Sequence, residues 1–150
     1  PDVRAAFDRM AADARAEKLT LAVRSGYRDW RTQDASFKRA WSKYGERARR
    51  YYAEAGHSEH QTGLALDLSS GAVGQPGYAF AKTPEAGWVA ANAARYGFII
   101  RYPEGKQAIT GVDHEPWHLR WVGVEVATDM ARTPGITLEE YLGITSQYAD

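Results

Sequence analysis

The stretch Ser58-Glu59-His60-Gln61-Thr62-Gly63-Leu64-Ala65-Leu66-Asp67-Leu68 is the part of the sequence that decides how the rest of the chain is interpreted. From Gly63 onward, leucines alternate with Ala65 and Asp67, which predicts a strand with one apolar face. His60 would then lie in the turn that enters this strand. If that turn folds back, the imidazole and the Asp67 carboxylate can reach one ion, because both are good zinc ligands. The alternative is a solvated loop histidine and a surface aspartate.

A second stretch, Asp113-His114-Glu115-Pro116-Trp117-His118-Leu119-Arg120-Trp121, supplies the remaining groups that such a site needs. His118 adds a second imidazole to His60 and Asp67. Three protein ligands leave the fourth tetrahedral position open for water, which is the pattern of a catalytic zinc. Glu115 is then the general base beside that water. The alternative for Glu115 is a surface carboxylate paired with Arg120.

These motifs resemble a known family. S-x-H-x-x-G-x-A-x-D, followed by E-P-W-H and preceded by S-G-Y-R at 25–28, is similar to the zinc D-Ala-D-Ala carboxypeptidases of the VanY type. These belong to the wider group of lysostaphin-like and hedgehog-like zinc folds. The resemblance covers about residues 19–123. It implies one Zn²⁺ per chain, held by His60, Asp67 and His118, with Glu115 as the base.

The resemblance also implies a substrate pocket. Arg28 would polarise the scissile carbonyl or clamp the terminal carboxylate, since a planar guanidinium can bind either in a bidentate manner. Ser58 and Gln33 fall where the related carboxypeptidases place substrate hydrogen-bonding groups, and Tyr102 is expected to line the same pocket. The two other histidines, His57 and His114, do not match the motif. We expect them in loops or behind the ligands, and either one is an alternative ligand.

Length and composition limit the class of protein. The 150 residues suit a single domain, 1–150, and the balance of 19 basic and 19 acidic residues gives no electrostatic case for binding nucleic acid or an anionic membrane. The absence of cysteine excludes disulfides and thiolate zinc sites. No apolar run reaches 18 residues, so we expect no membrane span in this chain. We also expect a monomer.

Hydrophobic periodicity predicts one α+β domain with a small, mostly antiparallel central sheet flanked by helices, and with the catalytic zinc in a surface cleft. The expected helices are 2–18, 30–55 with a break at Gly45, 84–96, 124–131 and 138–142. The expected strands are 19–24, 63–68, 98–102 and 117–122. Residues 69–81 are expected to form a loop beside the site.

The function that the resemblance implies is a zinc-dependent D,D-carboxypeptidase that removes the C-terminal D-alanine from peptidoglycan stem peptides, or their precursors, ending in D-Ala-D-Ala. Such a substrate implies an extracytoplasmic bacterial protein, secreted or anchored at the surface, whose signal or anchor is not present in this chain. An L,D-carboxypeptidase and an L-Ala-D-Glu endopeptidase are alternatives on the same scaffold. A non-catalytic zinc-binding module is the alternative from a different class, although a structural zinc needs neither Glu115 nor Arg28.

Overall fold

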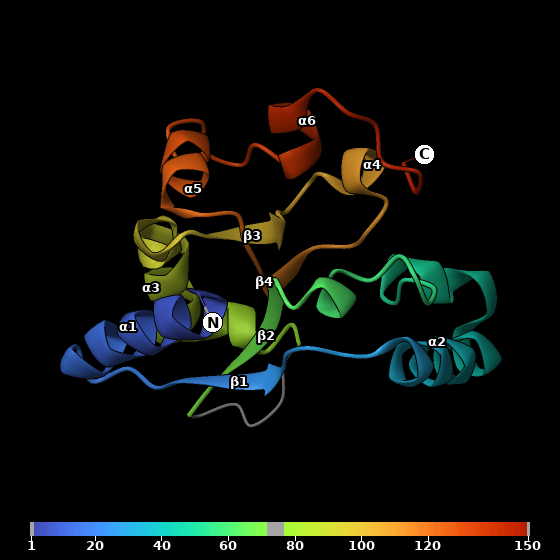
Figure 1. Ribbon diagram of the computed structural model, residues 1–150, viewed down its shortest axis with the longest axis horizontal. Helices are drawn as coiled ribbons and strands as arrows, with labels where there is room; N and C mark the ends of the chain where they lie inside the picture. The colour runs from blue at the N-terminus through green and yellow to red at the C-terminus, as the bar shows by residue number, and fades with distance from the viewer. Residues whose placement is uncertain (1, 72–76, 150) are drawn as a thin grey trace.

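The computed structural model describes residues 2–71 and 77–149, and a four-stranded sheet in the order β1-β2-β4-β3 lies at its centre (Figure 1). Each neighbouring pair of strands is antiparallel, which confirms the predicted α+β fold with an antiparallel sheet. The strands are β1 (Leu21–Ser25), β2 (Ala65–Ser70), β3 (Phe98–Tyr102) and β4 (Glu115–Trp121). The α-helices are α1 (Asp2–Ala16), α2 (Trp30–Tyr44), α3 (Pro84–Asn92), α4 (Gln107–Thr110), α5 (Val124–Met130) and α6 (Leu138–Leu142). The 3-10 helices are η1 (Gly45–Arg50), η2 (Glu59–Thr62), η3 (Phe80–Lys82) and η4 (Ala93–Tyr96).

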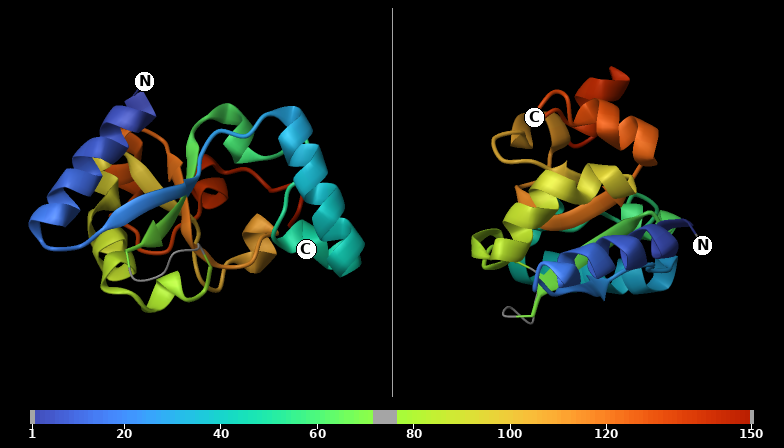
Figure 2. Two further views of the ribbon diagram at one scale, coloured as in Figure 1. Left: turned by 90° about the horizontal axis from the view of Figure 1, so that it is seen from below. Right: turned by 90° about the vertical axis from the view of Figure 1, so that its left-hand side faces the viewer.

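The main apolar core lies between the sheet and the pair α1 and α3, which the views show close together at one end of the molecule (Figures 1 and 2). α1 contributes a stripe of small and flexible residues at helical spacing, and the strands contribute larger side chains, as expected for one buried helix face against a sheet. The fully buried members include Met10, Ala14, Leu68, Phe98 and Leu119.

A second, smaller core lies at the β3 edge. Ile99 points away from the main core and packs with Ala127 and Met130 of α5, and α6 adds Leu138 and Tyr141. β3 is therefore covered on both faces. The two cores leave the opposite face of β2 and β4 available for the polar side chains described below.

Most predicted boundaries differ from the observed ones by a few residues, and the second helix, β4 and the loop 69–81 are three examples. Gly45 breaks the second helix as expected, at φ +59°, but the segment that follows is a 3-10 helix that ends at Arg50 and not at residue 55. β4 begins at Glu115, two residues earlier than expected. The predicted loop 69–81 is shorter, because β2 continues to Ser70 and η3 begins at Phe80; residues 72–76 lie outside the described residues.

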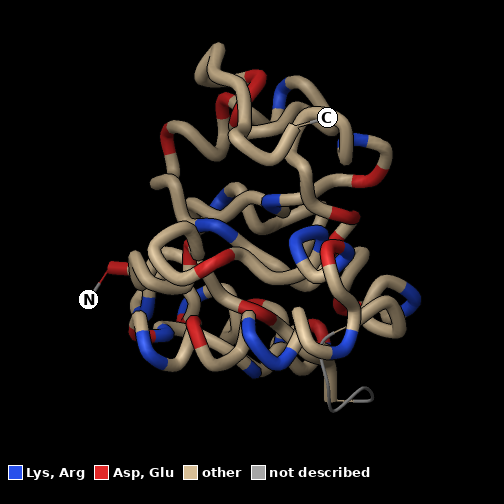
Figure 3. Tube along the Cα trace, turned by 90° about the vertical axis from the view of Figure 1, so that its right-hand side faces the viewer, with Lys and Arg blue, Asp and Glu red and all other residues tan. Residues whose placement is uncertain are grey.

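No helix in the described ranges is long and apolar enough to cross a membrane. In the view of Figure 3, basic and acidic positions are interspersed along the trace, in agreement with the balanced charge of the sequence.

Candidate metal centre and active site

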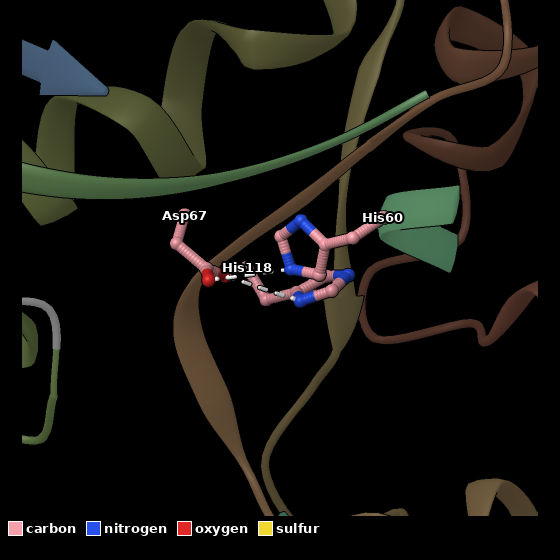
Figure 4. Close-up of side chains that lie close together, drawn as sticks. All are labelled: His60, Asp67 and His118. Atoms are coloured by element: carbon pink, nitrogen blue, oxygen red, sulfur yellow. Dashed lines mark ion pairs between the residues drawn. The ribbon is translucent and has the colours of Figure 1, made fainter. Parts of the chain in front are cut away.

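His60, Asp67 and His118 form one cluster, in which one donor atom from each side chain lies within 4.8 Å of the others (Figure 4). Nε2 of His60 is 3.2 Å from Oδ2 of Asp67, and Nδ1 of His118 is 3.2 Å from Oδ1 of the same carboxylate. Both imidazoles are buried, at 5% and 6% exposed. The three residues that the sequence analysis selected as ligands are therefore together in space.

Strand register explains why the cluster forms. Asp67 of β2 is the direct cross-strand partner of His118 of β4, so their side chains leave the sheet on the same face as close neighbours. His60 arrives from η2, which ends at Gly63 in the left-handed conformation, φ +73°. Only glycine adopts this conformation without strain, and it turns the chain directly into β2.

Hydrogen bonds set which ring nitrogen of each histidine faces the cluster. Nδ1 of His60 donates to the carbonyl oxygen of Gly26 at 2.8 Å, which leaves the Nε2 lone pair directed at Asp67. Nε2 of His118 donates to Oε2 of Glu59 at 3.4 Å, which leaves Nδ1 facing Asp67. Metal-binding histidines characteristically donate their second N–H in this way.

The electrostatics of the cluster also fit a cation. Oδ1 of Asp67 is buried without a hydrogen-bond partner, which is costly unless another group satisfies it. Burial alone would raise the pKa of Asp67, but the two imidazoles outweigh burial and hold that pKa well below its usual range. Burial lowers the pKa of His118, yet the neighbouring carboxylates of Asp67 and Glu59 reverse the effect and raise it to about 9. The site therefore favours positive charge, and two imidazoles with one carboxylate are a donor set that suits zinc.

Glu115 lies beside this cluster because of a β-bulge. Between two of the register pairs that join β3 and β4, Ile100 with Leu119 and Tyr102 with Glu115, β3 advances by two residues and β4 by four. Such bulges redirect side chains. Here Oε2 of Glu115 lies 3.5 Å from Nδ1 of His118, and burial raises the pKa of this carboxyl to about 8. A carboxyl with that pKa can take up and release a proton near neutral pH.

Arg28 reaches the cluster from the turn after β1. Its guanidinium donates to Oε1 of Gln33 at 2.7 Å and to Oγ of Ser25 at 2.9 Å, and it lies 4.0 Å from Oδ2 of Asp67. The amide nitrogen of Gln33 donates to the carbonyl oxygen of Ala53 at 2.6 Å. Gln33 therefore holds Arg28 in place, and the side-chain oxygen and nitrogen of Gln33 both already have partners.

A cavity of about 680 Å³ opens over these groups. All eight residues that the sequence analysis selected line it: Arg28, Gln33, Ser58, His60, Asp67, Tyr102, Glu115 and His118. The Tyr102 ring centroid lies 5.0 Å from that of His118. Tyr78 and Trp117, which meet edge to face, form a further wall.

The structure does not favour the alternative roles that the sequence left open for His57 and Arg120. His57 lines the cavity but contacts Gln147 and the Tyr148 ring, and it is outside the metal-type cluster. Arg120 pairs with Glu59 at 2.8 Å and leaves Glu115 free of that partner. Glu59 itself was missed: the only signal was its place beside His60, and its contacts come from distant parts of the chain.

Comparison with known proteins agrees with this geometry. A family model described as "VanY: D-alanyl-D-alanine carboxypeptidase" matches residues 1–124. The chain is 47% identical over 130 residues to the putative carboxypeptidase YodJ of Bacillus subtilis, covering 85% of this chain and 47% of that protein. It is 38% identical over 120 residues to a D-alanyl-D-alanine carboxypeptidase of Enterococcus faecium, covering 80% of this chain and 35% of that protein. The chain thus spans less than half the length of both.

Solved structures share the whole fold. The LdcB LD-carboxypeptidase superposes with a TM-score of 0.88 and 42% identity, covering 97% of this chain and 69% of that one. A variant of the vancomycin-resistance D,D-pentapeptidase VanY, solved in complex with Zn(II), superposes with a TM-score of 0.81 and 35% identity. The match covers 93% of this chain and 81% of that one.

The fold defines the structural class of the chain, which is that of the VanY-type peptidase structures. Within that class, the chain belongs to the VanY family.

Proposed function

We propose that this chain is a zinc-dependent carboxypeptidase that removes the C-terminal D-alanine from peptidoglycan stem peptides. The observation that carries the proposal is the cluster of His60, Asp67 and His118 with the buried Glu115 carboxyl beside it, in one cavity with Arg28. The D,D form of the activity, on peptides that end in D-Ala-D-Ala, follows from the family description and from the relatives named for it.

The chemistry divides among the residues of the cavity. His60, Asp67 and His118 would hold one zinc ion, which when bound supplies Lewis acidity to polarise the scissile carbonyl and to activate a water. Glu115 accepts a proton from the attacking water and returns it to the departing amine, a role open to a carboxyl that lies beside the cluster, 3.5 Å from Nδ1 of His118. Arg28, fixed by Gln33 and Ser25, binds the carbonyl or the terminal carboxylate of the peptide.

A second candidate is the L,D form of the activity, on the shorter peptide that ends in a single D-alanine after an L-configured centre. The observation that favours it is the likeness to the LdcB LD-carboxypeptidase, 42% identical over 97% of the chain. This identity exceeds the 38% and 35% found for the two D,D enzymes described above. Both forms release D-alanine with the same groups. They differ in the residue that lies before the scissile bond.

Either substrate belongs to the cell wall, so we propose that the chain acts outside the cytoplasm of a bacterium. We also propose that it acts as a monomer. The peptides themselves are the partners of the site. No other partner is needed for the chemistry.

Synthetic stem peptides test the proposal. Pentapeptide and tetrapeptide, each as the free acid and as the C-terminal amide, are incubated with the zinc-loaded chain, and released D-alanine and product masses are measured. Cleavage of the acid is expected, and the amide should react at least about tenfold more slowly, because the pocket group that pairs with the carboxylate is left unsatisfied. Glu115→Gln is the matched control.

Each outcome has a definite meaning. Faster cleavage of the pentapeptide supports the D,D form, and faster cleavage of the tetrapeptide supports the L,D form. Scission between L-Ala and D-Glu, or equal rates for acid and amide, contradicts the carboxypeptidase proposal and favours an endopeptidase. Zinc binding without cleavage of any peptide favours a non-catalytic module.

A further inference from the structure

Behind His118, on the side away from Asp67, lies an ion-pair network that the mechanism above does not use. We define the buried ion-pair network as Glu59, Arg101, Arg120 and Glu139. Their side chains are 14%, 10%, 21% and 4% exposed. Ionised groups at this depth need partners, because the loss of hydration is otherwise uncompensated.

Glu59 is the member that contacts the metal-type cluster, and its two oxygens have separate tasks. Oε1 accepts hydrogen bonds from Nε of Arg101 and from a terminal nitrogen of Arg120, each at 2.8 Å. Oε2 faces Nε2 of His118 at 3.4 Å. The two arginines thus fix one oxygen and aim the other at the imidazole. That contact keeps a proton on Nε2 and leaves Nδ1, the nitrogen beside Asp67, as the one that would bind an ion.

The network continues into the C-terminal part of the chain. Both terminal nitrogens of Arg101 bind Glu139, at 2.9 and 2.5 Å, in a bidentate pair. Glu139 belongs to α6, a short helix that Thr137 and Glu140 stabilise through reciprocal capping bonds. This helix lies beyond residues 1–124, to which the family model matches.

We propose that Glu59 is a positioning residue for His118, and that Glu139 of α6 supports Glu59 through Arg101. The C-terminal segment is on this account part of the metal site's support, although it carries no ligand. The inference rests on the proposed zinc site. It predicts that zinc affinity depends on residues that never contact the ion.

Zinc affinity of the full chain tests the first half of the proposal. Zinc is titrated against a chromophoric chelator into the unchanged chain, Glu59→Gln and Glu59→Ala, with circular dichroism to establish that each is folded. Loss of a hydrogen-bond partner behind a metal ligand typically weakens binding about 10–100-fold, and we expect Glu59→Ala in that range. Glu59→Gln retains an acceptor oxygen for Nε2–H and should recover part of the loss.

A second readout reports on His118 directly. In the zinc-loaded chain with ¹⁵N-labelled histidine, the Nε2 proton of His118 should be visible as a slowly exchanging resonance coupled to its nitrogen. It should weaken or vanish in Glu59→Ala. A residue that merely stabilised the fold would lower the free energy of unfolding and leave this proton unchanged.

Two neighbouring carboxylates of α6 test the second half. Glu139→Gln removes the charge that holds Arg101, and Glu140→Gln is the matched control, because Gln also completes the helix cap and only a surface ion pair with Lys106 is lost. We expect Glu139→Gln to weaken zinc binding, by less than Glu59→Ala, and Glu140→Gln to leave it unchanged. Equal zinc affinity in these two variants would overturn the role of α6.

The outcomes separate this inference from the proposed function. If the unchanged chain binds zinc and cleaves stem peptides, but Glu59→Ala binds zinc equally tightly with an intact His118 signal, only the positioning role is wrong. If the unchanged chain binds no zinc, the proposed function itself fails.

Discussion

At the scale of single residues, His118 shows how a site controls its own chemistry. The imidazole lies between Asp67 on one side and Glu59 on the other, and Glu115 approaches the same nitrogen as Asp67. A metal ion competes with a proton for that nitrogen. The carboxylates that raise the pKa of His118 to about 9 when no ion is bound are the same groups that favour a cation in its place.

Glu115 gives the sharpest prediction at this scale. Because it lies beside the cluster and is not among the three grouped donors, Glu115→Gln should leave zinc content near one per chain. Removal of a general base typically costs about 10²–10⁴-fold in rate, or roughly 3–5 kcal/mol of transition-state stabilisation. Elemental analysis and steady-state rates of the same preparation measure both. A variant that folds normally but loses its zinc would make Glu115 a ligand.

At the scale of elements, the site depends on irregularities in regular structure. The bulge in β4 brings Glu115 to the face that carries His118, and the left-handed Gly63 turns η2 into β2. Gly97 has a comparable role between η4 and β3. It adopts φ +86°, and an added Cβ would lie 2.8 Å from Nε1 of Trp121 and 2.9 Å from the backbone of Gly123.

Gly97→Ala should therefore destabilise the protein by about 1–3 kcal/mol, since both the backbone angle and the space oppose a side chain. Gly87→Ala is the matched control in α3, where the angle is not left-handed and nothing lies within 4 Å of an added Cβ. That control should gain about 0.5–1 kcal/mol, as alanine favours the helix. Urea unfolding of both variants checks the prediction, and equal stabilities would refute it.

The elements also show what a sequence can and cannot predict. Four strands and the cluster residues could be predicted, because alternation and the spacings from His60 to Asp67 and from Glu115 to His118 are local properties. The bulge could not, since it depends on how β3 and β4 pair. Glu59 was missed for the same reason: Arg101 and Arg120, which define its role, lie 42 and 61 residues away.

At the scale of the whole molecule, the buried site carries a cost in stability when no metal is bound. The pKa of Glu115 rises from 4.5 to about 8, and that of His118 from 6.5 to about 9. At pH values between the unfolded and the folded pKa, each group is protonated in the folded chain and deprotonated in the unfolded chain. The stability that each proton contributes is fully present below the unfolded pKa and is lost as pH rises through the folded pKa.

The metal-free chain should therefore lose free energy of unfolding as pH rises from about 5 to about 9. Glu115→Gln removes the part of the fall that begins near pH 4.5, so its curve should be flat up to about pH 6.5. Urea unfolding in the presence of a chelator at half-unit pH steps gives both curves. A free energy of unfolding that rises across this range in the unchanged chain would show that Glu115 and His118 do not dominate the pH dependence of stability. Added zinc should offset the loss increasingly at high pH, because it binds the deprotonated ligands.

The central claim is that the cluster of His60, Asp67 and His118 holds the one zinc ion on which catalysis depends. The most direct measurement removes all metal with a chelator, returns zinc stepwise, and follows D-alanine release from whichever stem peptide the chain cleaves. We predict no release from the metal-free chain and recovery that is complete at one zinc per chain, with no recovery in Asp67→Ala. Release that survives complete metal removal would contradict the account.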